Sequence, residues 1–326
     1  SLQRVRILKI IMYICSVFLM DDAMNVRAKG FAYGAVAAAS YGLNPLFTLP
    51  LYKAGMGVDS VLFYRYFFAC LLLGILMKTQ GKSFAIRKTE ILPLALIGLL
   101  FSFSSLFLFV SYNYMDAGVA STILFVYPVL VALIMAVFFH ERVSLVTLLS
   151  IGLAFFGIFL LYHGGDGKTL NLLGVLFVFL SSLTYAIYII GVNQSFLRTF
   201  PIDKLTFYAL LFGMSVYIVR LKFGVALQPV PSPALWINVL SLALFPTIIS
   251  LTTMTRSIHY IGSTPAAILG ALEPLTALFF GVVVFGEELT PRIILGVVLV
   301  LTAVTLIVMA KPLGKIIKKQ VIHRNY

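Results

Sequence analysis

Long apolar stretches alternate with short polar gaps along this chain. Ten of these stretches have about 17 to 25 residues, the length that crosses the ~30 Å hydrocarbon core of a bilayer as a helix. We place them at residues 30–52, 60–78, 92–114, 118–139, 144–162, 171–192, 205–221, 235–257, 263–285 and 291–310. The gaps hold the Gly, Pro and charged residues typical of loops. The pattern predicts an all-α polytopic membrane protein with ten transmembrane helices.

Composition supports the same class of protein. Of 326 residues, 61% are hydrophobic and 11% are charged, and the mean hydropathy is +1.06, which excludes a soluble pair of domains. The net charge of +13 does not indicate nucleic-acid binding, because the basic residues lie in the gaps and at the termini, and the basic tail has no interleaved aromatic residues apart from the last residue. Both cysteines, Cys15 and Cys70, lie within apolar runs, so we expect no disulfide, metal site or cofactor.

The first 29 residues differ from the ten predicted spans. Arg4, Arg6 and Lys9 precede an apolar run at 10–20 that ends at an acidic pair. This run is too short to cross a bilayer, and it lacks the cleavage site of a signal peptide. We interpret residues 1–29 as an N-terminal extension that is cytoplasmic or interfacial, with Met24 as an alternative start of the physiological chain.

The distribution of Lys and Arg predicts the orientation. Of the 24 basic residues, 18 fall on the side of the chain start, Arg65 lies inside a span, and five fall on the other side: Lys53, Lys168, Arg220, Lys222 and Arg292. Basic residues are enriched in cytoplasmic loops. We therefore predict that both termini are cytoplasmic, although Arg220 and Lys222 are basic on the predicted outer side.

The apolar pattern of the second half repeats that of the first. Pro274 lies 146 residues after Pro128 (274 − 128), and in earlier spans an offset of 144 aligns Asp203 with Asp59 (203 − 59). Each half has five spans, and an odd number places the second copy upside down in the membrane. The sequence therefore predicts two inverted repeats, an architecture of alternating-access transporters. The predicted regions are the repeats 30–163 and 164–310, followed by a basic cytoplasmic tail, 311–326.

Short motifs inside these repeats resemble a known family. They are Tyr64-Arg65-Tyr66 in the second span, Ala271-Leu-Glu-Pro274 in the ninth, Gly286-Glu-Glu-Leu-Thr290 after it, and Gly296. Their order and duplication over residues 30–310 resemble EamA-type members of the drug/metabolite transporter superfamily. The resemblance implies a secondary carrier of small organic solutes, often an amino-acid or metabolite exporter of a bacterial inner membrane.

Glu273 is the leading candidate for a role in coupling or gating. A carboxylate inside a membrane is neutral, paired or in contact with water, and it marks a functional site by default. Pro274 directly after it removes a helical hydrogen bond and bends the helix. The first half carries Tyr127 before Pro128, so we expect the two prolines to act as hinges. The alternative is that Glu273 only hydrogen-bonds a neighbouring helix.

Other polar residues inside spans are candidates for binding the solute. Arg65 would hold a carboxylate of the solute or pair with Glu273; alternatively, it extends to the interface. Tyr41 and Asn44 share a helix face, as do Tyr185 and Tyr188, because each pair is three residues apart. Polar residues in spans also serve to join helices, so this alternative stays open for all four.

The acids at the ends of the predicted spans are more typical of structural residues than of functional ones. Glu141, Glu287 and Glu288 follow the fourth and ninth spans, where an acid usually caps the next helix. Ser144 and Thr290-Pro291 also have the pattern of helix starts, and Asp116 and Asp203 read as caps.

Two other classes of function fit the sequence less well. The motifs H-E-x-x-H, G-x-S-x-G and the P-loop are absent from the sequence, which disfavours a membrane-embedded enzyme. The sparse polar positions do not form the charged rings or polar stripe of a pore. The sequence therefore predicts an exporter of a small amino-acid-like solute, with facilitative or uptake transport as the alternative. The expected partners are this solute and membrane lipids, which the basic tail contacts, and no nucleic acid.

Overall fold

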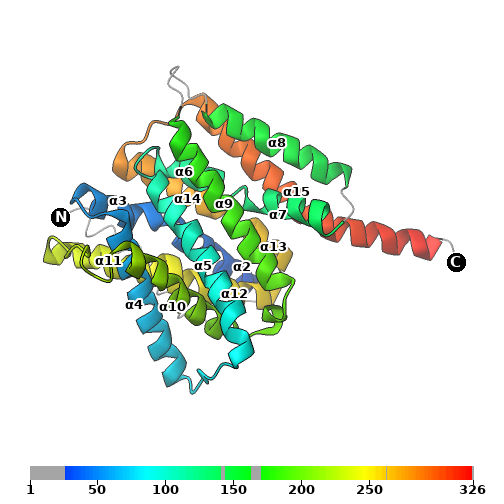
Figure 1. Cartoon of the computed structure of the whole chain (residues 1–326). Coiled ribbons are helices and arrows are strands. Elements are labelled where there is room, and N and C mark those ends of the chain that lie inside the picture. Colours follow the sequence, from blue (N-terminus) through cyan, green and yellow to red (C-terminus); the bar gives the residue numbers. More distant parts are fainter. Residues whose placement is uncertain (1–25, 141–143, 163–169, 262, 325–326) are drawn as a thin grey trace.

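The computed structural model describes residues 26–140, 144–162, 170–261 and 263–324 (Figure 1). These residues form helices joined by loops, and no strand occurs among them. The first half contains α2 (Val26–Gly42), α3 (Asn44–Lys53), α4 (Val58–Thr79), α5 (Lys88–Ser111), α6 (Ala117–Leu124), α7 (Tyr127–Phe138) and α8 (Leu145–Tyr162). The second half contains α9 (Leu172–Asn193), η1 (Phe196–Thr199), α10 (Ile202–Arg220), η2 (Pro233–Leu235), α11 (Trp236–Ala243), η3 (Leu244–Ile249), α12 (Ser250–Ile261), α13 (Ser263–Leu269), α14 (Leu272–Phe280), η4 (Gly281–Phe285) and α15 (Pro291–Arg324).

The helices are those of a polytopic membrane protein. In the described part of the chain, eight helical segments are long and apolar enough to cross a membrane, and the shorter apolar helix Leu145–Leu161 accompanies them. The predicted first span is divided between α2 and α3. The all-α membrane fold is confirmed, whereas the number of ten spans stays a prediction. The predicted N-terminal run at 10–20 lies outside the described residues.

Several predicted spans are interrupted helices. The fourth breaks between α6 and α7 and the ninth between α13 and α14, in both cases just before a proline. A proline has no N–H to donate, so the preceding turn loses a hydrogen bond. The eighth span instead passes through the π-helical turn η3, which contains Pro246. The first span breaks at Gly42–Leu43 in the same way, just before Pro45, one of the prolines that the sequence indicates as bends.

The helices α4 and α10 pack against each other in opposite directions. Asp59, near the start of α4, accepts two hydrogen bonds from Arg220 at the end of α10, at 2.6 and 3.1 Å. Asp203, near the start of α10, pairs with Lys82 just beyond the end of α4. Equivalent ion pairs therefore join both ends of this antiparallel pair. The prediction that Asp203 caps its helix was wrong, because its side chain pairs with Lys82 and makes no cap bond.

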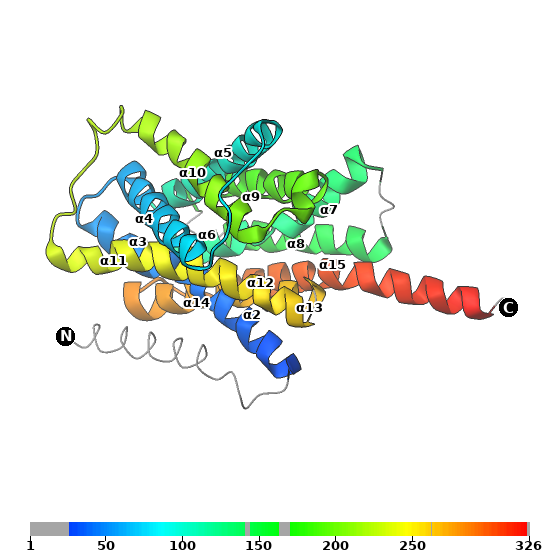
Figure 2. The same cartoon turned by 90° about the horizontal axis from the view of Figure 1, so that it is seen from below.

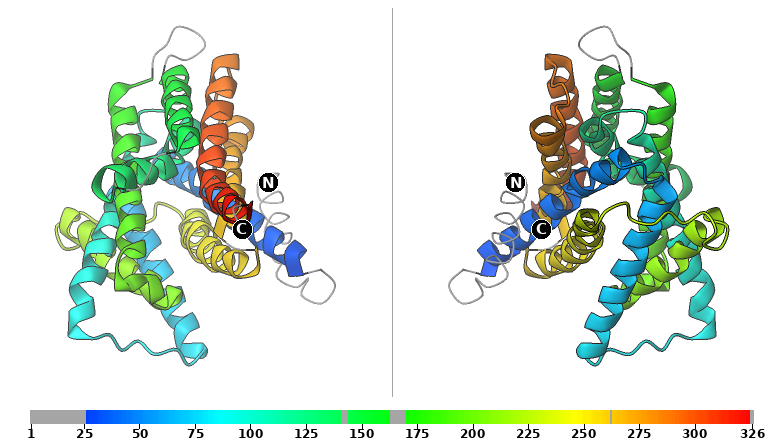
Figure 3. Two further views of the ribbon diagram at one scale, coloured as in Figure 1. Left: turned by 90° about the vertical axis from the view of Figure 1, so that its right-hand side faces the viewer. Right: turned by 90° about the vertical axis from the view of Figure 1, so that its left-hand side faces the viewer.

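Other helix pairs that connect the two halves include α2 with α12, α5 with α9, and α8 with α15 (Figures 2 and 3). Ser104 of α5 and Ser181 of α9 each donate to the other's backbone carbonyl, at 3.0 and 2.7 Å. Ser257 of α12 donates to Gly30 of α2 at 2.8 Å. Small residues and hydroxyls that bond across helices are typical of membrane interfaces, where apolar surface alone does not drive association.

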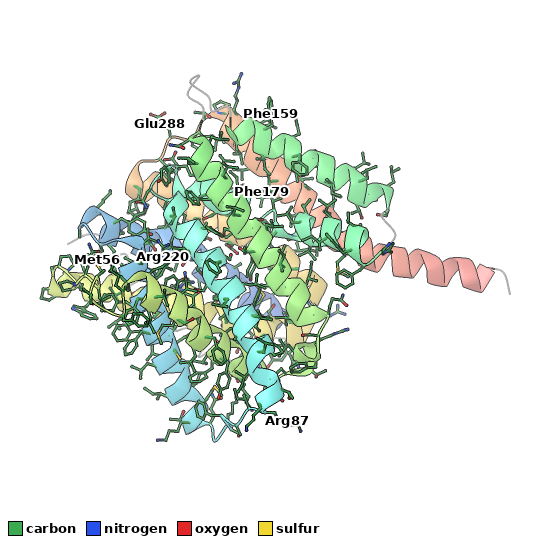
Figure 4. The ribbon with its side chains drawn as sticks, in the orientation of Figure 1. Met56, Arg87, Phe159, Phe179, Arg220 and Glu288 are labelled. Atoms are coloured by element: carbon green, nitrogen blue, oxygen red, sulfur yellow. The ribbon has the colours of Figure 1, made fainter. Side chains whose placement is uncertain are left out.

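Two sets of loops lie at opposite ends of this bundle. Arg87 and Glu288 lie far apart, at the lower and upper edges of the view in Figure 4. We call the end with Asp59, Arg220 and Glu288 the predicted outer end, and the end with Lys82, Arg87 and Asp203 the predicted cytoplasmic end. At the outer end, Arg220 has Asp59 as its partner, which explains a basic residue on that side.

Candidate functional site

The breaks of three spans converge inside the bundle. A Cβ atom placed on Gly42 would lie 2.4 Å from the backbone oxygen of Glu273, and one placed on Gly270 would lie 3.3 Å from the Phe125 ring. The break between α2 and α3 therefore lies directly against the turn before Pro274. The same turn also lies against the break before Pro128. Broken helices that meet inside a transporter are a common place for its substrate and coupling ions.

Glu273 occupies the first turn of α14 at this convergence. Its side chain is half-buried and lies within electrostatic range of the tyrosines at positions 41, 127 and 185. These tyrosines belong to the first, fourth and sixth spans, so both halves of the chain surround the acid. The structure places Glu273 near Tyr41, Tyr127 and Tyr185.

The tyrosines form one aromatic cluster beside Glu273. The Tyr127 and Tyr185 rings are 4.7 Å apart in an edge-to-face arrangement, and the Tyr185 and Tyr188 rings stack at 5.7 Å. Phe101 of α5 closes the cluster at 5.4 Å from Tyr188. Such packing fixes the rings while their hydroxyl groups keep hydrogen-bonding capacity. Tyr188 thus belongs to the cluster through its contacts with Tyr185 and Phe101.

Arg65 is one of the most buried side chains of the protein, at 2% exposed. Its Nε donates to Thr247 Oγ1 at 3.1 Å, and its guanidinium lies 5.3 Å from the centre of the Phe109 ring. It also lies close enough to the Tyr41 hydroxyl to interact with it. Among the described residues, no carboxylate lies within ion-pair distance of Arg65. In this structure Arg65 is therefore buried instead of reaching the interface, and it forms no ion pair with Glu273.

Asn44 has a structural contact and a free acceptor. Its side-chain amide donates to the Tyr41 carbonyl at 2.9 Å, a carbonyl that Pro45 cannot satisfy because it has no N–H. Asn44 Oδ1 and the hydroxyls of Ser40 and Thr48 are buried without hydrogen-bond partners among the described residues. Buried polar atoms are usually bonded to protein, water or ligand. These three oxygens lie one turn apart on the first span.

A narrow cleft leads toward Arg65 from the predicted cytoplasmic end. It lies between α4, α10 and the η3–α12 segment, and its lining includes Asp203, Thr206, Thr252 and Thr247. Thr247 is the residue that binds Arg65. The inverted repeat relates this cleft to a position between α10, α4 and α5. That position is filled by the side chains of Tyr66 and Tyr217, whose rings are 5.0 Å apart. The two halves therefore differ here as well.

Glu287 has a partner that the sequence did not reveal. Its Oε1 accepts from the Ala117 N–H at 2.8 Å and its Oε2 from the Gly118 N–H at 3.1 Å. It therefore caps α6, a helix of the other half, and not the helix that follows it. Thr290 caps the following helix by accepting from the Ile293 N–H.

The remaining cap predictions have mixed outcomes. Ser144 begins α8 as predicted, because its Oγ accepts from the Thr147 N–H at 3.1 Å. Asp116 precedes α6, but its side chain makes no cap bond, since Glu287 occupies that position. Glu141 lies outside the described residues.

Comparison with known proteins identifies the family. A model of the EamA-like transporter family matches residues 28–163 and, a second time, residues 172–309. An uncharacterized transporter of Synechocystis sp. is 32% identical over 207 residues, which cover 61% of each chain. An uncharacterized transporter of Archaeoglobus fulgidus is 28% identical over 58% of this chain and 66% of its own. The chain thus matches less than two thirds of the length of these two relatives.

Two more comparisons extend over most of the chain. The uncharacterized transporter YcbK of Bacillus subtilis is 23% identical over 82% of this chain and 90% of its own. The crystal structure of another protein shares the fold with a TM-score of 0.60 and 17% identity, covering 86% of this chain and 96% of that one. The two matches of the family model and the apolar helices lead to one conclusion: the chain is an integral membrane protein that belongs to the EamA-like transporter family.

Proposed function

We propose that the protein is a secondary carrier that exports a small organic solute with an anionic group, such as an amino acid, by alternating access. The observation that carries this proposal is Arg65. Its guanidinium is buried and has no carboxylate partner in the described part of the chain. A buried charge without a partner costs several kcal/mol, so a solute that supplies the missing anion would be bound strongly.

The surroundings of Arg65 suit such a solute. Its Nε donates to Thr247, it interacts with the Tyr41 hydroxyl, and its two terminal nitrogens form the fork that binds a carboxylate with two parallel hydrogen bonds. Tyr41 and the unpartnered oxygens of Ser40 and Asn44 supply further hydrogen-bonding groups on the first span. Tyr185 and Tyr188 supply an aromatic wall for the apolar part of the solute.

The helix arrangement supports alternating access. The antiparallel α4 and α10 are joined at both ends by equivalent ion pairs, as two inverted halves, 30–163 and 164–310, would require. Breaks before Pro128 and Pro274 give each half a bend at the same place. In this proposal the halves rock about these two prolines, and Glu273 between them couples or gates the movement.

A transport assay with purified protein in liposomes tests the proposal. Labelled amino acids, nucleosides and sugars are offered with and without a pH gradient, and we expect flux for a carboxylate-bearing solute. Arg65→Gln should lower this flux at least tenfold, which corresponds to about 1.4 kcal/mol, and Arg65→Lys should restore part of it because the charge remains. Equal flux in all three proteins would contradict a role of Arg65 in binding.

The same assay separates the alternatives. Flux that ignores the pH gradient favours a facilitative carrier, and accumulation toward the cytoplasmic side favours uptake. Hydrolysis of a solute without transport would instead indicate a membrane-embedded enzyme. We further propose a bacterial inner membrane with both termini cytoplasmic. Labelling of single cysteines in the 164–167 loop by an impermeant reagent from outside intact cells tests this orientation, and labelling only after lysis would reverse it.

A further inference from the structure

The hydroxyl of Thr247 bonds two groups at once. Its Oγ1 donates to the Leu242 carbonyl oxygen at 3.3 Å and accepts from the Nε of Arg65 at 3.1 Å. Thr247 is 1% exposed and Arg65 is 2% exposed, so this contact is buried. A threonine hydroxyl has a single proton to donate and two lone pairs with which it accepts. The bond to Leu242 therefore directs a lone pair, and not the proton, toward Arg65.

Pro246 explains why this hydroxyl is oriented. A proline has no N–H, so Pro246 cannot bond the carbonyl of Leu242 four residues before it. The chain forms the π-helical turn η3 here, and the next residue, Thr247, reaches this carbonyl with its side chain. Single π-helical turns inside α-helices are frequent at functional sites. The Pro-Thr pair thus places a fixed acceptor for Arg65 at the bend of the eighth span.

Three segments hold the guanidinium of Arg65. Its Nε bonds Thr247 of η3, the Phe109 ring of α5 lies 5.3 Å from it, and the Tyr41 hydroxyl of α2 interacts with it. A guanidinium is planar, and its five N–H groups point in fixed directions. Since the Nε–H points at Thr247, the terminal nitrogens are the donors that remain for Tyr41. They are therefore directed toward Tyr41, beside the break of the first span at Gly42–Leu43.

This orientation limits how a carboxylate can bind. A carboxylate makes two parallel hydrogen bonds to a guanidinium, either end-on with both terminal nitrogens or side-on with Nε and one of them. Thr247 already accepts the Nε–H. We propose that Thr247 is the positioning residue of the solute site: it holds the Arg65 Nε and leaves the end-on pair of terminal nitrogens for the carboxylate of the solute. This inference rests on the proposed function, in which Arg65 binds the anionic group.

The other half shows that helix packing does not require this contact. At the repeat offset of 144, Arg65 of α4 corresponds to Ala209 of α10 (209 − 65). Ala209 is equally buried, and its backbone oxygen lies 2.8 Å from a Cβ placed on Gly98 of α5. A small residue thus fills the equivalent position by close backbone packing. The buried guanidinium and its oriented acceptor in the first half therefore indicate a role in binding.

Thr247 also lies between Arg65 and the cytoplasmic cleft. It lines the cleft together with Leu73, Thr206 and Thr252, whereas Arg65 is not part of the lining. Thr247 therefore covers the Nε side of the guanidinium toward the cleft. A solute that enters from the predicted cytoplasmic end would meet Thr247 before the terminal nitrogens of Arg65.

NMR spectra of the full chain with isotope-labelled arginine, in detergent micelles, test the orientation. The Arg65 signals are those that disappear in Arg65→Lys. Acetate is the carboxylate probe, and acetamide, which has the same shape, is the uncharged control. In the native chain we expect acetate to shift the terminal N–H signals of Arg65 and to leave its Nε–H signal in place, while acetamide shifts neither. A large shift of the Nε–H signal with acetate would show side-on binding and overturn the inference.

Substitutions of Thr247 test its role as a positioning residue. Thr247→Val keeps the shape and removes the hydroxyl, so hydrogen exchange at the Arg65 Nε–H should be about tenfold faster and acetate binding about threefold weaker. Thr247→Ser keeps the hydroxyl and should restore both. Thr252→Val is the matched control, because Thr252 lines the same cleft but bonds Ile248 of its own span. It should behave as the native chain does.

The outcomes separate this inference from the proposed function. Equal acetate affinity in the native chain and in Thr247→Val would overturn the role of Thr247 and leave the proposal about Arg65 intact. Weaker binding in Thr247→Val with rescue by Thr247→Ser, together with absent solute flux in liposomes, would support this inference and overturn the carrier function alone. A native chain whose Arg65 signals do not respond to acetate would contradict both.

Discussion

The span with Pro128 and the span with Pro274 have the same shape and different chemistry. Both begin as a short helix, α6 or α13, break, and continue as a second helix that starts one or two residues before the proline. The residue before the proline is Tyr127 in the first case and Glu273 in the second. The shape follows from proline, which both have, whereas the chemistry follows from one side chain that differs.

The surroundings of the two breaks differ as well. Tyr127 lies in an aromatic cluster with Tyr185, a residue of the continuous helix α9. Glu273 lies against Gly42 at the break of the first span. At the repeat offset of 144, Gly42 corresponds to Ala186 within α9 (186 − 42). One side of the pseudo-symmetric site is thus a packed aromatic wall, and the other is a broken helix with an acid.

Among the substitutions that test this comparison, removal of the acid should have the largest effect on transport. We expect Glu273→Gln to lower solute flux at least tenfold or to remove its dependence on a pH gradient, because the amide cannot exchange a proton. Flux in liposomes with and without the gradient measures this, after normal membrane insertion has been checked. If Glu273→Gln transports as the native chain does, the acid has only a structural role.

Filling the close contact beside Glu273 should have the next largest effect. In Gly42→Ala, the added Cβ would lie 2.4 Å from a backbone oxygen, which cannot move as a side chain can. We expect a loss of about 1–3 kcal/mol in stability from overpacking, seen as a lower unfolding temperature in detergent. Gly152→Ala is the matched control, because nothing lies within 4 Å of a Cβ there. Equal unfolding temperatures for the two variants would show that the breaks do not meet tightly.

Replacement of the two prolines compares them directly as hinges. Pro128→Ala and Pro274→Ala each restore an N–H that can complete the helix. We expect both to lower the transport rate severalfold and by similar amounts, since both bends must change during rocking. A loss of transport in only one variant, measured at equal protein density in liposomes, would mean that a single span moves.

The smallest effect is expected at Tyr127. Among the described residues, Tyr127 contacts Tyr185 and Phe125 through its ring. Tyr127→Phe keeps the ring, so flux should stay within about twofold of the native value. A large loss of flux would show that the hydroxyl contacts the solute or Glu273 during transport, and the comparison would then be between two functional residues.

The helices and the proline breaks could be predicted from the sequence because their causes are local. A run of ~20 apolar residues must form a helix in a bilayer, since no other segment satisfies its own backbone there. The bends near residues 128 and 274 follow from the chemistry of proline itself. The inverted repeat also predicted that α4 and α10 run in opposite directions. The ion pairs Asp59–Arg220 and Lys82–Asp203 agree with this arrangement.

The partners of the polar residues depended on tertiary structure. Glu287 bonds a helix start 170 residues away, Arg65 bonds Thr247 at a separation of 182 residues, and Gly42 meets Glu273 only because two spans cross. A polar residue in a span must find some partner, but its sequence neighbours do not specify which. The sequence by itself determined the membrane fold, its duplication and the bends. Only the packing of the helices decided that Arg65 lacks an acid, that Glu287 caps the opposite half, and that the break of the first span meets Glu273.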